Sequence, residues 1–143
     1  MLDSGEVNRR LTHHLAELQR AAARHRAAVD AARKAFEERL DAEVAPTARQ
    51  LVQALKSRGV HFSVQTPAGA VRLVADRSAD DVIAIELDVT RRPPAVVASR
   101  QYTRGRRLLG DEVVVAEGDA IAALDAERTL EVLLERIEPF VEK

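Results

Sequence analysis

The chain opens with a long stretch in which apolar residues recur at the spacing of a helix. No proline or glycine occurs from Glu6 to Val44, and alanine, arginine, leucine and glutamate dominate, all of which are good helix formers. The apolar steps alternate between four and three residues, which is the heptad pattern of paired helices. The positions are Leu11, Leu15, Leu18, Ala22, His25, Val29, Ala32 and Phe36. We therefore predict one long helix whose apolar face is a helix-pairing interface.

This predicted helix is longer than the domain to which it belongs. Residues 6–44 would span roughly 58 Å as a helix, whereas a compact domain of this chain length measures roughly 37 Å across. Part of the helix should therefore project and pair with a second copy or with a partner helix. We expect residues 1–45 to form this projecting assembly element and residues 46–143 to form the globular part of one domain. The sequence leaves open whether the pairing is parallel or antiparallel.

The apolar pattern of the helix changes after Phe36, where the steps lengthen to four residues. Such a stutter should unwind a supercoil locally. Pro46 then predicts a kink or a break. Residues 47–58 resume the helical pattern, and Gly59 suits the position that ends a helix.

From Val60 the apolar period changes to two, which is the period of β-strands. Turn residues separate the alternating segments, as in an antiparallel meander. The segments are 60–65, 71–75, 83–89, 95–103 and 107–116. Residues 120–124 are either a sixth strand or the beginning of the C-terminal helix.

Asp125 is a good N-cap for that last helix, and an apolar stripe follows it at Ala126, Leu130, Leu133, Ile137 and Val141. The predicted fold is therefore α+β. It has a long N-terminal helix kinked or broken near Pro46, an antiparallel meander of five or six strands, and a C-terminal helix packed on the sheet.

Composition narrows the function classes. The chain has no cysteine, which excludes disulfides, thiolate metal sites and a cysteine nucleophile. Its longest apolar runs are far shorter than a membrane span needs. We expect a cytoplasmic protein that does not contact a membrane. Only three of its 22 basic residues are lysines, which together with the abundant alanine is typical of GC-rich bacterial coding.

The candidate chemical groups do not form a recognisable motif. His13 and Glu17 have the spacing to face one ion, but a zinc site needs three or four ligands. His25 lies on the apolar face and His61 on the solvent side of a strand. The acidic loop at 76–81 lacks the alternating oxygen donors and central glycine of a calcium loop. We expect no catalytic, metal or cofactor site, and thus no enzyme.

An arginine cluster is the strongest local charge feature. Residues 89–110 contain six arginines and no acid, whereas residues 111–143 contain ten acidic residues against three basic ones. The candidate polyanion contacts are Arg91, Arg92, Arg100, Arg104, Arg106 and Arg107. The alternative is that these arginines pair with the acidic C-terminal helix or keep a sheet edge soluble.

These observations favour a non-enzymatic bacterial interaction module that dimerises, or binds a helical partner, through its long N-terminal helix. The alternative is non-specific nucleic-acid binding through the arginine-rich hairpin at 91–107. Tyr102 is the only aromatic residue there, which disfavours recognition by base stacking.

Overall fold

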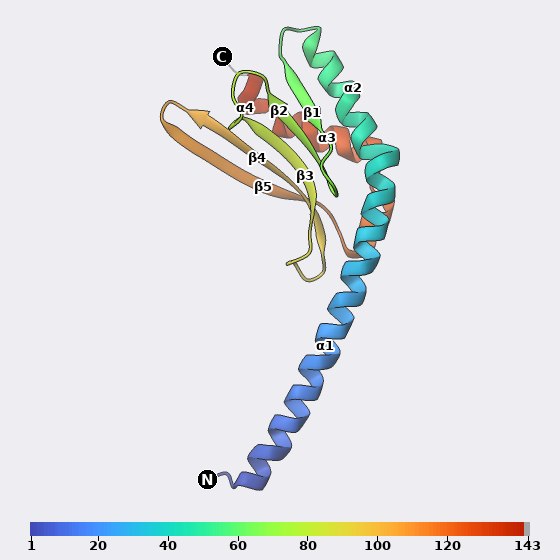
Figure 1. Cartoon of the computed structure of the whole chain (residues 1–143), viewed down its shortest axis with the longest axis vertical. Helices are drawn as coiled ribbons and strands as arrows, with labels where there is room; N and C mark the ends of the chain where they lie inside the picture. Colours follow the sequence, from blue (N-terminus) through green and yellow to red (C-terminus); the bar gives the residue numbers. More distant parts are fainter. Residues whose placement is uncertain (142–143) are drawn as a thin grey trace.

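A computed structural model, which describes residues 1–141, has the predicted α+β architecture. The N-terminal helix is formed by α1 (Ser4–Arg39), a π-helical turn (Leu40–Val44) and α2 (Ala45–Lys56). The strands are β1 (Phe62–Gln65), β2 (Ala70–Ala75), β3 (Val82–Asp88), β4 (Ala95–Arg104) and β5 (Arg107–Glu117). A 3-10 segment (Gly118–Ala123), α3 (Ala126–Arg136) and α4 (Glu138–Val141) follow. Figure 1 shows that α1 extends far beyond the sheet.

The predicted kink near Pro46 is confirmed, and the helix continues through it. The Ala45 N–H bonds to the Leu40 carbonyl, so this turn spans five residues instead of four. A proline ring clashes with the carbonyl four residues earlier in a regular helix and offers no N–H. The wider π turn just before Pro46 accommodates the ring, and it lies where the apolar pattern stutters.

The sheet is a meander in which each strand pairs antiparallel with the next, in the order β1-β2-β3-β4-β5. Its central core row runs across four strands through Val71, Ile85, Ala98 and Val113. The β4–β5 hairpin turns at Gly105, whose φ is 64°. A tight hairpin turn requires this left-handed backbone. The five strands that the sequence pattern predicts are therefore all present.

Residues 120–124 differ from both sequence expectations. Residues 120–123 belong to the 3-10 segment and Leu124 is its extended C-cap, so these residues form neither a sixth strand nor the first turn of α3. Gly118, with a φ of 55°, turns the chain away from the sheet. Ile121, which is 1% exposed, anchors the segment in the core. Asp125 then caps α3 separately by accepting a bond from the Arg128 N–H at 2.8 Å.

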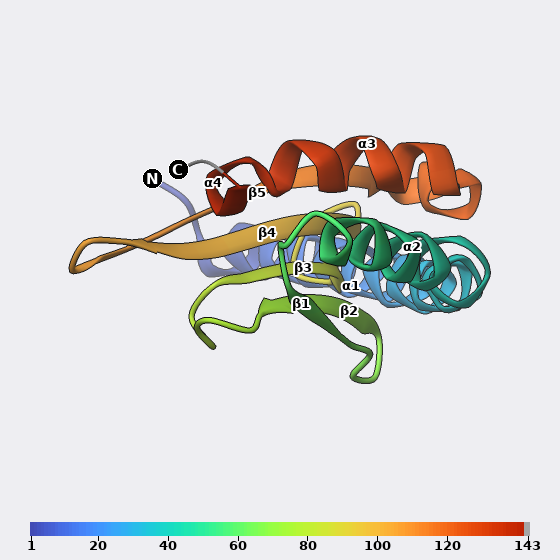
Figure 2. The same ribbon diagram turned by 90° about the horizontal axis from the view of Figure 1, so that it is seen from above.

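The helices cover one face of the sheet. α2 contacts β1 and β2, α3 contacts β4 and β5, and α2 and α3 run side by side over that face (Figure 2). The end of α1 contacts β3 and the 3-10 segment. Among residues 1–141, no helix combines the length and apolar content that crossing a membrane would need.

The prediction of which residues of the C-terminal helix are buried is partly wrong. Leu133 and Ile137 are buried as expected, but Leu130 and Val141 are 39% and 41% exposed. Arg136 occupies part of the buried face instead, at 2% exposure, because Asp111 and Glu135 neutralise its charge. The buried face of α3 therefore consists of Thr129, Val132, Leu133 and Arg136, and only Leu133 among them belongs to the predicted stripe.

Candidate functional site

The N-terminal part of α1 is a helix that its own local interactions stabilise. The Asp3 carboxylate caps the helix by accepting a bond from the Glu6 N–H at 2.8 Å. Glu6 also accepts bonds from Arg9 at 2.6 Å and from Arg10 at 2.8 Å. Hydrogen bonds from these two guanidinium groups lower the pKa of Glu6. A carboxylate at this position also interacts favourably with the helix dipole.

The exposed apolar residues of this segment share one side of the helix. Leu11, Leu15 and Leu18 are 50%, 48% and 52% exposed, and Val7, one turn before Leu11, is 49% exposed. We call Val7, Leu11, Leu15 and Leu18 the N-terminal stripe. Val7 was not among the predicted pairing residues. Its distance of four residues from Leu11 is the signal that would have included it.

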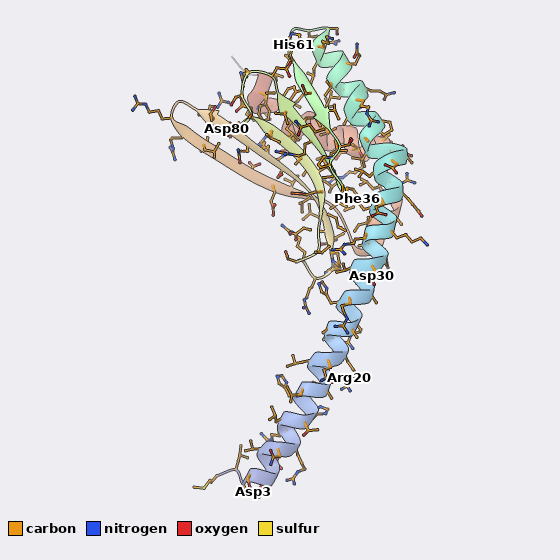
Figure 3. The ribbon with its side chains drawn as sticks, in the orientation of Figure 1. Asp3, Arg20, Asp30, Phe36, His61 and Asp80 are labelled. Atoms are coloured by element: carbon orange, nitrogen blue, oxygen red, sulfur yellow. The ribbon has the colours of Figure 1, made fainter. Side chains whose placement is uncertain are left out.

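The other predicted pairing residues approach and then enter the domain. Ala22, His25 and Val29 are half-buried, and Ala32 and Phe36 are buried. Figure 3 shows Phe36 at the level of the sheet, whereas Arg20 and Asp3 lie on the projecting part of the helix. Ala32 and Phe36 belong to the hydrophobic core of their own chain. The predicted pairing surface must therefore be corrected to exclude them, and the projecting element is shorter than residues 1–45.

His25 marks the point where the helix meets the domain. Its Nε2 atom lies 3.1 Å from the carbonyl oxygen of Val89, in the loop after β3. A second anchor lies further along the helix, where Arg39 donates to the Leu124 carbonyl at 2.6 Å. From His25 onward, the domain itself covers the apolar face.

The six predicted polyanion-contact arginines do not form one cluster. Arg91 and Arg92 precede β4, whereas Arg104 lies at its far end, about 30 Å away along the strand. Arg91 is bound by Asp88 at 3.2 Å and by Glu112 at 2.7 Å. Arg92 is exposed. The arrangement thus separates the residues that the sequence places within one short stretch.

Arg100 belongs to an ion network on the helix-covered side of the sheet. It donates two bonds to Asp111, at 2.9 and 3.0 Å, and Arg136 donates to the same carboxylate. Hydrogen bonds from Arg100, followed by those from Arg136, hold the pKa of Asp111 below its ordinary value. The bond from Arg136 likewise lowers the pKa of Glu135. Arg100 therefore ties β4 to β5 and is already neutralised.

The remaining basic residues lie at the tip of the β4–β5 hairpin. Arg104, Arg106 and Arg107 are exposed there. The guanidinium carbons of Arg100 and Arg104 lie 5.8 and 5.7 Å from the ring centre of Tyr102. Tyr102 thus supports Arg104 through a cation–π contact, and its ring also packs against Phe140.

A hollow lies on the face of the sheet that the helices leave uncovered. It has a volume of about 660 Å³, and its lining combines small residues with Arg72, Glu86 and Gln101. Glu86 is the one carboxylate among the described residues that line it.

The other histidines and the acidic loop make only isolated contacts with neighbouring groups. His13 lies 3.2 Å from Glu17 on the exposed helix, and His61 is exposed. Asp81, 2% exposed, accepts bonds from Arg77 at 2.9 Å and from the Thr103 N–H at 3.2 Å. Within residues 1–141, no group of three or more such side chains is placed to hold a metal ion.

Comparison with known proteins gives no further assignment. No protein-family model, curated protein or solved structure matches the chain. The N-terminal stripe and the arginines of the hairpin tip are therefore the two candidate interaction surfaces, and they must be judged on their own physical chemistry.

Proposed function

We propose that this chain is a non-enzymatic assembly module of the bacterial cytoplasm, and that its projecting helix pairs with a second copy of the chain. The observation that carries the proposal is the N-terminal stripe. Four large apolar side chains lie on one side of a helix that extends away from its own domain (Figure 1). Contiguous apolar surface of this kind typically marks an interaction site.

The expected strength of this pairing is modest. Each residue of the stripe has about half of its surface exposed, so covering that surface contributes about 1 kcal/mol per side chain, half of the value for complete burial. Four residues from each copy would contribute about 8 kcal/mol, which is of the same order as the ~4–15 kcal/mol cost of association. We therefore expect a dimer whose population depends on protein concentration.

The test is the solution mass of a double variant, Leu15→Glu with Leu18→Glu. Placing two carboxylates on the stripe should shift the protein to monomer at concentrations where the parent is dimeric. The matched control is Leu130→Glu with Leu134→Glu, because these leucines of α3 are similarly exposed, at 39% and 51%. A parent that remains monomeric at high concentration would refute the self-pairing proposal.

The hairpin tip supports a second candidate, non-specific nucleic-acid binding. Arg104 ends β4, Arg106 lies in the two-residue turn and Arg107 begins β5, and all three are exposed. Phosphate contacts through them would weaken steeply as salt rises. If this candidate is correct, Arg104→Glu with Arg106→Glu should abolish a gel shift of duplex DNA at low salt. Absence of any shift with the parent chain would eliminate it.

A further inference from the structure

We propose that the two projecting helices pair antiparallel, with the two copies of Leu15 near the two-fold axis of the dimer. This inference rests on the proposed self-pairing and deepens it by fixing the orientation of the partner. Three observations carry it: the part of the apolar face that the domain occupies, the charge distribution along the helix, and the sizes of the residues at the two ends of the free segment.

The first observation is steric. The domain covers the apolar face of α1 from His25 onward, where Val89 contacts His25 at 3.1 Å and Phe36 is 1% exposed. In a parallel pair, the partner helix would run along this same face into the space that the domain fills. The two domains would also lie at the same end of the pair, between the helices.

An antiparallel pair avoids this conflict. The free part of the apolar face runs from Val7 to Ala22, which is roughly 22 Å of helix. Reversing one copy places Val7 opposite the partner's Ala22 and Leu11 opposite the partner's Leu18. The two domains then lie at opposite ends of the dimer, beyond the overlap of the two free apolar faces.

The second observation concerns charge. Arg20, Arg24 and Arg26 lie at the domain end of the free segment with no acidic residue among residues 20–26. At the other end, Asp3 and Glu6 balance Arg9 and Arg10. A parallel pair would place the two arginine-rich segments side by side, and like charges at such spacing repel. An antiparallel pair places each of them beside the balanced end and opposes the two helix dipoles.

The third observation concerns size. The domain end of the free face carries only the small residues Ala21 and Ala22, whereas the opposite end carries Val7. Antiparallel packing brings a large residue against small ones at both ends and the leucines together in the middle. Alternation of large and small residues across an interface is how helices pack closely.

The test measures distances between spin labels on the two copies of the dimer. The chain contains no cysteine, so Gly5→Cys and Thr12→Cys each give one label, seven residues apart on the same flank of the helix. A parallel pair gives nearly equal distances for the two labels. The antiparallel pair separates the Gly5 labels by roughly 28 Å along the axis and the Thr12 labels by roughly 8 Å.

Light scattering of the same labelled samples separates the possible outcomes. A dimer whose Gly5 distance exceeds its Thr12 distance by about 20 Å supports the proposal, and Leu15→Glu should then remove both distances. A dimer with equal short distances overturns the antiparallel orientation but leaves self-pairing intact. If the protein is a dimer but neither label shows a short distance, the two copies pair through another surface. If the protein is a monomer, no intermolecular distance is observed. Each of these two outcomes overturns both proposals.

Discussion

The two ends of helix α1 carry the same apolar spacing in opposite environments. At the domain end, Ala32 and Phe36 are 6% and 1% exposed, whereas Leu11 and Leu18 at the other end are 50% and 52% exposed. The spacing predicts which side of a helix will be covered. It carries no information on whether the covering surface comes from the same chain or from another. One end of this continuous helix therefore belongs to the core of its own domain, and the other end is the part that we propose for assembly.

Among variants at the two ends of the helix, we expect the largest effect on the free energy of unfolding at the domain end. Phe36→Ala should lower the free energy of unfolding by about 3–5 kcal/mol, because it leaves a cavity in the core. Leu18→Ala should change it by less than about 0.5 kcal/mol at low concentration, where the helix is unpaired. Urea unfolding monitored by circular dichroism measures both. Comparable losses from the two variants in dilute protein would show that the stripe packs within its own chain.

Acid should act on both the domain and the projecting helix, but through different groups. The folded-state pKa values of Asp111 and Glu135 lie below their ordinary values. Their contribution to stability is therefore present above about pH 4 and is lost as pH falls through the folded-state values. Asp111→Asn should lower stability at neutral pH by about 1 kcal/mol and flatten the acid dependence. Thermal unfolding from pH 7 to pH 3 checks this, and an unchanged profile in the variant would contradict the role of the network.

The same acid titration probes the projecting end through Glu6, whose pKa Arg9 and Arg10 lower. Its protonation should fray the first turn of the helix without unfolding the domain. Helical circular dichroism should therefore decline slightly before the cooperative transition. Glu6→Gln should remove this early decline, whereas loss of helix and domain signals together in the parent would contradict the separation.

A further prediction concerns the boundary between the two ends of the helix. His25→Ala removes the contact with the Val89 carbonyl and should cost about 1 kcal/mol. His13→Ala, on the exposed part of the same helix, is the matched control and should have almost no effect. Equal effects in urea unfolding would show that the domain does not begin to cover the helix at His25.

Much of the fold follows from local pattern. Three local features of the sequence predict elements that the structure confirms. They are the change of apolar period at Val60, the stutter before Pro46 and the turn at Gly105. The errors arise from tertiary contacts. Burial of Arg136 depends on Asp111, which is distant in sequence, and the 3-10 segment at 118–123 depends on Ile121 entering the core.

The candidate site was less predictable than the fold. Heptad spacing indicates one pairing face from Leu11 to Phe36, but which residues the domain covers depends on the position of the β3–β4 loop. The arginine-rich stretch looks continuous in sequence, yet an extended strand places Arg91 and Arg104 at opposite ends. Proximity in sequence is therefore a poor guide to proximity in space wherever a long strand intervenes.

The most direct test of self-pairing is the solution mass of the parent chain across a wide range of concentrations. Sedimentation equilibrium or light scattering should show a mass near 15.7 kDa in dilute solution that rises towards twice this value as concentration increases. Leu15→Glu with Leu18→Glu should hold the lower mass throughout. A parent chain that stays monomeric at millimolar concentration would contradict the account.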